Sequence, residues 1–478
     1  MRIDFDWLPM ATPLDPAEEP PGSIDPLGTL AHAERLAEAL LPGFTARMWR
    51  GRLLTFATVA AAIADRTVAL MDGREDLRLE ARLAFERLFV SAVVRMADRD
   101  PATYANAPRR LPGRDLAKKA LLEREPLTRA NFLKGQAVNG PFGVIARLAR
   151  RMELIDDDGR MGRKAVEVLM AWSDDEQLPG VLYEDGGVAR DGAAWMADVV
   201  KQTAACVAHR DWPGGAHRIW DLLARHLRPD RIGPKERRAI LQLLYADPVR
   251  RRVVELLKKR ADLYREIREE TVDRGEQERA TLLRGVRPEL GDEPTDRYIA
   301  AVIEAVDVYE QASGLFQQAF EGLVWALKVH GGRARRDAIL ADPRLHRHFE
   351  TTLSEMSALV PRMDRAIESL RNQPSVDPAQ LVEPILRLRE DFLAATVSKL
   401  ALAETMLDRH ERVQKDKAKA PWIERESYWT LMPGENRVAA EAPPVWRDAY
   451  LHPFKIQNAY SMLGDLGQVT IEVRNAEE

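Results

Sequence analysis

The longest run of helical apolar spacing lies between residues 295 and 331, and it constrains the fold more than any other feature. Its apolar residues recur at three- and four-residue steps, which is the period of an amphipathic helix. The stripe comprises Ile299, Val302, Val306, Tyr309, Phe316, Phe320, Leu323 and Leu327. Gly331 can end the helix. Because a long apolar stripe must be buried, we interpret it as bundle core, with a partner-binding surface as the alternative.

Three further stretches predict long helices, at about 247–283, 343–371 and 377–418. The first carries apolar residues at helical spacing, and Asp377-Pro378 is suited to cap the last. Four long helices joined by short breaks favour an antiparallel bundle, which we assign to residues 249–418.

The rest of the chain divides by pattern into four more segments. Residues 1–113 form an N-terminal helical region, 114–176 a winged-helix module, and 177–248 a helical connector. Residues 419–478 form an aromatic, irregular tail in which GQVTIEVR (467–474) resembles a strand. The predicted fold class is therefore mainly α, with a helical N-terminal region, a winged helix, a long-helix bundle and a small irregular or β tail.

The winged-helix prediction depends on residues 139–172. A helix after Pro141 has one apolar face that includes Phe142 and Leu148, and ELIDDDGRMG can form the hairpin that follows it. The other face carries Arg147, Arg150 and Arg151. Because arginine contacts both phosphates and base edges, these three residues are the predicted nucleic-acid-binding site. Many winged helices bind proteins instead, so that alternative stays open.

Composition limits the function classes. The chain has 478 residues, which predicts two or three domains, and 45% hydrophobic with 31% charged residues is a globular balance. A net charge of −4 excludes a uniformly basic binder but not a local basic patch. The single cysteine, Cys206, and the lack of a signal-peptide pattern favour the cytoplasm. The apolar window 53–64 is shorter than the roughly 20 residues that span a bilayer.

The common catalytic motifs are missing from the sequence. There is no Walker loop, dinucleotide fingerprint, HExxH, CxxC or GxSxG. We therefore predict a protein that is not an enzyme and that has no cofactor and no metal. An enzyme with a site assembled from distant residues is the remaining alternative.

Four small clusters were weighed as metal or catalytic sites, and each has a structural interpretation that we favour. Cys206 with His209 lacks a second ligand pair, and the aspartates at 156–158 do not fit a calcium loop. His346, His348 and Glu350 point in different directions on a helix. The acidic run comprises Glu269, Glu270, Asp273 and Glu276, and such runs are usually solvated helix faces.

Further arginine clusters lie outside the predicted winged helix. They are Arg109/Arg110, Arg250–Arg252 and Arg333/Arg335/Arg336. Each is a weaker indication of nucleic-acid contact than the 147–151 cluster, because charged residues usually only solvate a helix face.

Two stretches near the ends of the chain contain short motifs. Leu41-Pro42-Gly43, Arg47 and Arg50/Arg52 match an LLPG-x-T-x-R-x-x-R-x-R start, and His452-Pro453-Phe454-Lys455 match an HP-[FY]-[RK] pattern. With these motifs the chain resembles uncharacterised proteins encoded beside bacterial antiphage defence genes. The resemblance covers residues 25–64 and 419–469, and it implies a defence context without a mechanism. We therefore expect a DNA-associated subunit of an antiviral system. It would contact double-stranded DNA and other subunits but no membrane; a scaffold, for example in an SMC-like complex, is the alternative.

Overall fold

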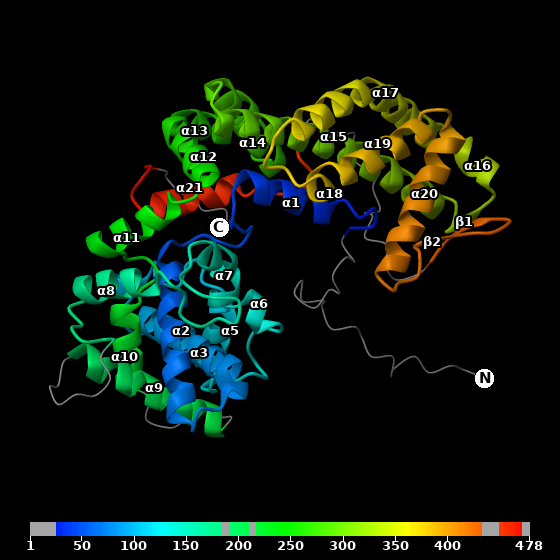
Figure 1. Ribbon diagram of the computed structural model, residues 1–478. Helices are drawn as coiled ribbons and strands as arrows, with labels where there is room; N and C mark the ends of the chain where they lie inside the picture. Colours follow the sequence, from blue (N-terminus) through cyan, green and yellow to red (C-terminus); the bar gives the residue numbers. More distant parts are fainter. Residues whose placement is uncertain (1–24, 183–190, 210–216, 433–448, 471–478) are drawn as a thin grey trace, which may run out of the picture. The chain divides into compact units, whose positions relative to one another are not determined.

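The computed structural model describes residues 25–182, 191–209, 217–432 and 449–470, and it is mainly helical (Figure 1). The chain forms two compact units. Unit 1 comprises Met1–Thr29, Phe316–Ser354 and Ala394–Val445, and unit 2 comprises Leu30–Leu315, Glu355–Leu393 and Trp446–Glu478. Each unit is assembled from separated stretches. The five-segment division made from the sequence stays a prediction.

The first half of unit 2 is a succession of short and medium helices. They are α1 (Leu30–Leu40), α2 (Arg52–Leu70), η1 (Glu75–Leu77), α3 (Arg78–Arg99), α4 (Pro101–Tyr104), α5 (Arg114–Glu123), α6 (Gln136–Asn139), α7 (Pro141–Arg151), α8 (Ala165–Asp175), α9 (Asp191–His209), α10 (His217–His226) and α11 (Pro234–Leu244). Helices α9, α10 and α11 lie in the stretch 177–248, where the sequence predicted a helical connector.

Helix α2 is the core helix of this half. It packs against α3, α7, α8 and α9, and Phe56 stacks on Phe85 and Phe89 with ring centroids 5.5 and 4.3 Å apart. At 19 residues, α2 is long and apolar enough to cross a membrane by length and composition. The sequence analysis judged the apolar window 53–64 too short to span a bilayer, and the observed helix is longer than that window. However, 78% of its apolar window is buried inside the protein. This burial is typical of the core of a soluble protein.

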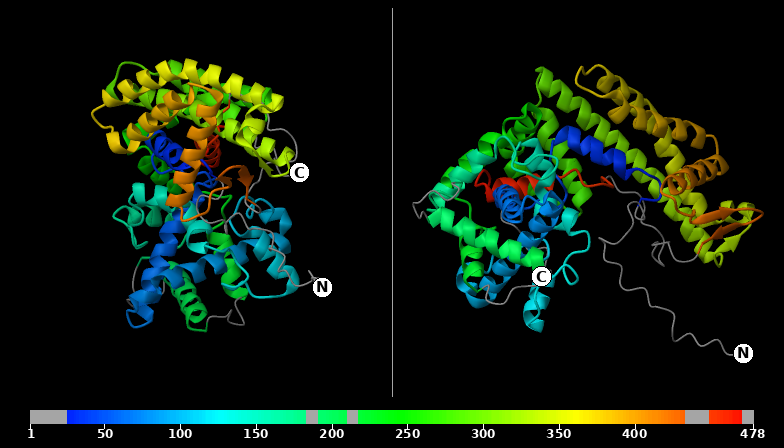
Figure 2. Two further views of the ribbon diagram at one scale, coloured as in Figure 1. Left: turned by 90° about the vertical axis from the view of Figure 1, so that its right-hand side faces the viewer. Right: turned by 60° about the horizontal axis from the view of Figure 1, so that its bottom comes forward.

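The remaining helices of unit 2 follow α11 and include parts of two long helices. They are α12 (Pro248–Lys259), α13 (Ala261–Glu270), α14 (Arg274–Ala280), the π-helical turn η2 (Thr281–Val286), η3 (Arg287–Glu289), α15 (Pro294–Val329), α17 (Pro343–Arg371), α18 (Pro378–Leu381), α19 (Glu383–Ala395) and α21 (Ile456–Asp465). Helices α15 and α17 lie side by side in unit 2 (Figure 2), where Arg362 bonds to Asp307 and Gln311.

The bundle prediction is confirmed in outline, and two of its four long helices are confirmed individually. Helix α15 has 36 residues and α17 has 29, and Gly331 follows α15 with a positive φ of 76°. Every stripe residue from Ile299 to Leu327 is at most 1% exposed, so the stripe is core. The other two helices are wrong as single elements. The stretch 247–283 breaks into α12, α13, α14 and the start of η2, and 377–418 breaks into α18, α19 and α20.

Unit 1 combines the C-terminal part of α15 with the N-terminal part of α17, α16 (Arg336–Leu340), α20 (Lys399–Asp416) and a small sheet. The sheet has the order β1 (Arg333–Ala334), β3 (Trp429–Leu431), β2 (Ile423–Arg425), and both pairings are antiparallel. The tail therefore contains β structure, in β2 and β3. Of the strand predicted at 467–474, residues 467–470 form none, and 471–474 lie outside the described residues. Helix α21 was missed.

The segment expected to be a winged helix contains α7 and α8 with a turn between them. Pro141 occupies the first turn of α7, as expected. The hairpin at 153–162 is held by one isolated antiparallel bridge between Ile155 and Met161. A winged helix is not confirmed by these elements.

Candidate functional site

The three arginines predicted to bind nucleic acid lie on the outer face of α7 and form ion pairs within unit 2. Arg147 lies 3.6 Å from Glu34 and 3.7 Å from Glu38 of α1, and Arg151 lies 3.1 Å from Glu38. Arg150 lies 3.7 Å from Asp157. The side chains are 41–59% exposed. A ligand could reach them, but its phosphates would compete with carboxylates already in place.

The small clusters weighed as metal sites have structural roles where the structure describes them. Cys206 is buried, and burial raises the pKa of its thiol to about 11, while the side chain of His209 lies outside the description. Lys399 approaches both His346 and Glu350, so a cation is already present beside them. Within the described residues, no group of three His, Cys, Asp or Glu could hold a metal ion.

The acidic run near residue 270 also has structural partners. Glu270 pairs with Arg284 at 2.7 Å, and Asp273 caps α14 by accepting a hydrogen bond from the Glu276 backbone N–H. Glu276 in turn accepts from the Thr271 hydroxyl. These contacts agree with the interpretation of the acidic run as a solvated helix face and not a metal site.

A different group of arginines meets in a cleft of about 1220 Å³ in unit 2. Its walls come from the loop before α2, the loop and first turn around α5, helix α13 and helix α21. The charged lining residues are Arg47, Arg50, Arg109, Arg110, Arg114, Arg268, Asp115, Asp230 and Asp465. Six arginines against three aspartates leave a formal charge of +3 in a chain of net charge −4. We call this the arginine cleft.

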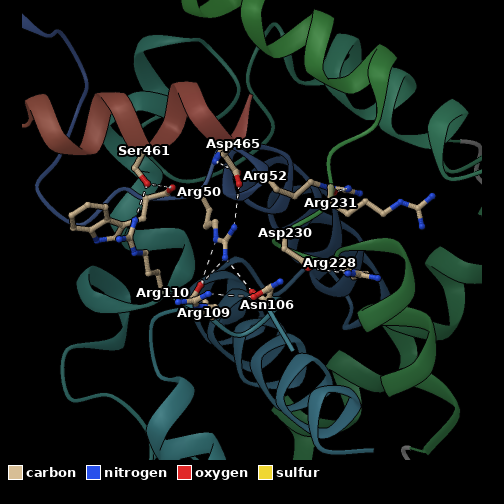
Figure 3. Close-up of polar contacts among 12 residues, drawn as sticks. Arg50, Arg52, Asn106, Arg109, Arg110, Arg228, Asp230, Arg231, Ser461 and Asp465 are labelled. Atoms are coloured by element: carbon tan, nitrogen blue, oxygen red, sulfur yellow. Dashed lines mark hydrogen bonds and ion pairs between the residues drawn. The ribbon is translucent and has the colours of Figure 1, made fainter. Parts of the chain in front are cut away.

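Arg50 spans the arginine cleft and holds its walls together (Figure 3). Its guanidinium donates to the Asp465 carboxylate of α21 at 3.2 Å and to the backbone carbonyls of Asn106 and Arg109 at 3.1 and 3.3 Å. Asp465 also accepts from the Gly51 backbone N–H at 2.8 Å, directly before α2. Burial raises the pKa of Asp465 above its usual range, against the opposing effect of Arg50. Arg50 is therefore a structural cation of the cleft.

A second contact joins an aromatic ring to an arginine at the same wall. The Arg110 guanidinium lies 4.7 Å from the ring centroid of Trp49, and it donates to the Ser461 hydroxyl at 3.0 Å. Ser461 donates in turn to the Trp49 carbonyl at 3.2 Å, which links the loop to α21 (Figure 3). Trp49 is half-buried, so part of the indole remains at the surface.

The remaining arginines lie at the rim. Arg47 is exposed and donates to the Asn139 side-chain oxygen, and in the described part of the chain it pairs with no carboxylate. Arg109 is also exposed, and its guanidinium lies 3.4 Å from the Asn106 side-chain oxygen. Arg114 pairs with Asp115 at 2.9 Å. Arg47 is bonded to a neutral oxygen, so its charge remains available to an anion.

The floor is formed by two tyrosines and by a glycine. Tyr264 and Tyr460 stack with ring centroids 3.8 Å apart, and the Tyr460 hydroxyl donates to the Leu257 carbonyl. Gly113 begins α5 with φ of 81°, and a Cβ there would come within 2.2 Å of Phe132. Only glycine fits this turn, and the turn brings Arg114 to the wall.

Beneath the cleft, Arg52 secures the start of α2. It is 1% exposed and pairs with Glu176 at 2.9 Å and with Glu236 at 2.8 Å. Burial raises the pKa of Glu236 to about 7 in spite of this neighbour. Of the three arginines in the LLPG-x-T-x-R-x-x-R-x-R pattern, Arg47 and Arg50 thus line the cleft, while Arg52 is structural.

The arginine cleft was not predicted as a site from the sequence. Arg109/Arg110 had been noted as a weak cluster, and Arg47 and Arg50 only as part of a resemblance. Of the other noted clusters, Arg250 is buried and donates to the carbonyls of Leu244 and Leu243. Arg333 and Arg335 lie over the ring of Tyr428 in unit 1.

Comparisons with known proteins add no relative. No family model, no curated protein and no solved structure matches the chain.

Proposed function

We propose that this protein is a nucleic-acid-binding subunit without enzymatic activity, and that the arginine cleft is its contact surface. Following the resemblance at the two ends of the chain, we propose that it acts in a bacterial antiviral defence system together with other subunits. Both resembling stretches contribute to the cleft: Arg47 and Arg50 from the first, and α21 from the second.

The observation that carries this proposal is the concentration of guanidinium groups. Six arginines from three separate segments gather in one cleft of a protein that is acidic overall. Like charges repel, so such a cluster is costly unless an anion or internal acids offset it. Among the described residues, three aspartates line the cleft. A ligand with several phosphates is the anion that so many separated guanidinium groups fit.

The α7 arginines are the alternative contact surface. A winged helix at 114–176 would present Arg147, Arg150 and Arg151 to DNA, but these side chains already face Glu34, Glu38 and Asp157. The arginine cleft is therefore the proposed nucleic-acid contact surface. A scaffold role without nucleic-acid contact is the alternative at the level of function.

The test compares two matched double variants with the wild-type protein. Arg47→Ala with Arg109→Ala removes two exposed cleft guanidiniums, and the Arg109 carbonyl that Arg50 uses is retained. Arg147→Ala with Arg151→Ala removes two exposed guanidiniums from α7. Affinity for a fluorescein-labelled oligonucleotide is measured by fluorescence anisotropy at several salt concentrations. Thermal unfolding shows that each variant is folded.

The cleft variant should bind at least about tenfold more weakly, and the slope of log affinity against log salt should become shallower by roughly 1–2, since each lost phosphate contact removes about 0.7–0.9. The α7 variant should bind like the wild type. The opposite pattern would place the contact on α7. A wild-type protein that binds no oligonucleotide at low salt would contradict the proposal and favour the scaffold.

A further inference from the structure

We infer that the ligand of the arginine cleft is a single strand of nucleic acid, with a base stacked beside Trp49 and Arg110 and the neighbouring phosphates on the rim arginines. This inference rests on the proposed function and deepens it. It differs from the double-stranded ligand expected from the sequence.

The shape of the site is the first argument. The phosphates of a duplex lie on a convex cylinder, whose major groove alone is about 12 Å wide. The arginine cleft is concave, and its arginines come from the loop before α2, the start of α5 and helix α13, with α21 closing another side. Its volume of about 1220 Å³ is only slightly above the roughly 300–1,000 Å³ of small-ligand pockets. A flexible strand can enter such a site, whereas a duplex can meet only the rim.

The pairing of Trp49 with Arg110 is the second argument. Proteins that hold single strands alternate cations with aromatic rings, because every base has a π-face that stacks. Arginine planes stack bases in the same manner. Trp49 is half-buried and lies under the Arg110 guanidinium, 4.7 Å from it. The stacked indole and guanidinium both line the arginine cleft, and we call this pair the platform.

Arg110 is held in place for this role. Its backbone has φ of 57°, in the left-handed region that side chains other than glycine rarely adopt. Its guanidinium donates to Ser461 of α21, which also bonds to the Trp49 carbonyl. Ring and guanidinium are thus fixed before a ligand arrives. A preformed platform reduces the entropy that binding must overcome.

The rim supplies the phosphate contacts at suitable positions. Arg47 and Arg109 are exposed and lie on the same two loops as Trp49 and Arg110. A base on the platform would therefore bring its flanking phosphates towards exposed guanidiniums. Because this contact uses a π-face and phosphates, we expect little sequence preference.

The test uses the full-length protein and labelled oligonucleotides of equal length: single-stranded oligo-dT, oligo-rU and a blunt duplex. The protein should bind oligo-dT more tightly than the duplex. Trp49→Leu should weaken oligo-dT binding at least about fivefold, the lower end of the loss for one base–aromatic stack. The same change should leave duplex binding within twofold. Comparison of oligo-dT with oligo-rU identifies the sugar that the site accepts.

Trp49→Phe serves as the control, since it keeps an aromatic face and should retain most of the affinity even if Trp49→Leu folds poorly. Equal affinity for strand and duplex, or equal loss with Phe and Leu in folded variants, would overturn the single-strand inference while the proposed function stands. Absence of binding to all three oligonucleotides would overturn the proposed function itself.

Discussion

Three carboxylates of unit 2, two buried and one partly buried, occupy helix N-termini that belong to distant parts of the chain. Glu86 accepts from the Phe142 backbone N–H at the start of α7, and Asp465 accepts from Gly51 before α2. Glu278 accepts from Phe454 just before α21. A carboxylate at this position satisfies free N–H groups and is favoured by the helix dipole. Burial nevertheless raises the pKa of all three.

Glu86 gives a pH-dependent prediction. Burial raises its pKa from 4.5 to about 7, so the folded state binds this proton more tightly than the unfolded state does. The stability due to the protonated carboxyl is complete below about pH 4.5 and is lost as pH rises through 7. Relative to Glu86→Gln, the wild type should lose on the order of 3 kcal/mol of unfolding free energy across that interval.

The measurement is urea unfolding of both proteins at half-unit steps from pH 4.5 to 8. The Gln variant removes the titrating group, so its slope with pH should be flatter, whatever its absolute stability. Parallel slopes in the two proteins would show that Glu86 does not titrate in this range.

At the scale of elements, the spacing of apolar residues predicted where helices form but not where the longer predicted helices break. The sequence predicted the apolar stripe of α15 and the end of this helix at Gly331, because helical spacing of apolar residues and a C-terminal glycine are both local signals. The breaks at 271–273 and 396–398 were missed although each holds a capping residue, Asp273 or Ser398. Apolar residues continue at helical spacing through 396–398, at Leu393, Val397 and Leu400, so the pattern gives no sign of that break. Residues 271–273 lie in a charged stretch, where the cap at Asp273 is the local signal of the break.

The site was less predictable than the helices for a physical reason. Its arginines come from stretches near residues 50, 110 and 268, and α21 closes it from near residue 460. Nothing local indicates that these stretches meet. Likewise, Arg47, Arg50 and Arg52 look alike in sequence, and only the positions of Glu176 and Glu236 make Arg52 the buried one.

The contact of α21 with α2 provides an element-scale prediction. Asp465→Ala removes both the acceptor for the Gly51 N–H and the carboxylate that Arg50 binds. We expect a loss of about 1–2 kcal/mol of unfolding free energy, the upper range for a lost helix cap. Asp465→Asn keeps a side-chain oxygen and should lose less than half as much. Chemical denaturation measures the unfolding free energy of both variants. Equal losses would show that Asp465 stabilises the protein through its charge and not through the hydrogen bond from the Gly51 N–H.

At the scale of the whole molecule, charge distribution rather than total charge supports the account. The chain carries −4 overall, yet the arginine cleft carries a formal +3. A basic cleft in a chain of net negative charge attracts a polyanion to that cleft. The apolar stripe of α15 is buried inside the protein, so it is not available as a surface for a partner. The central claim is therefore that nucleic acid enters the cleft.

The most direct test of that claim is ultraviolet crosslinking of the full-length protein to a thymidine-rich single strand, followed by mass spectrometry of the crosslinked peptides. We predict crosslinks in the loop that contains Trp49, in residues 106–114 and in α21, and their loss in Arg47→Ala with Arg109→Ala. Crosslinks confined to residues 147–151, or spread evenly over the surface and unchanged in that variant, would contradict the account.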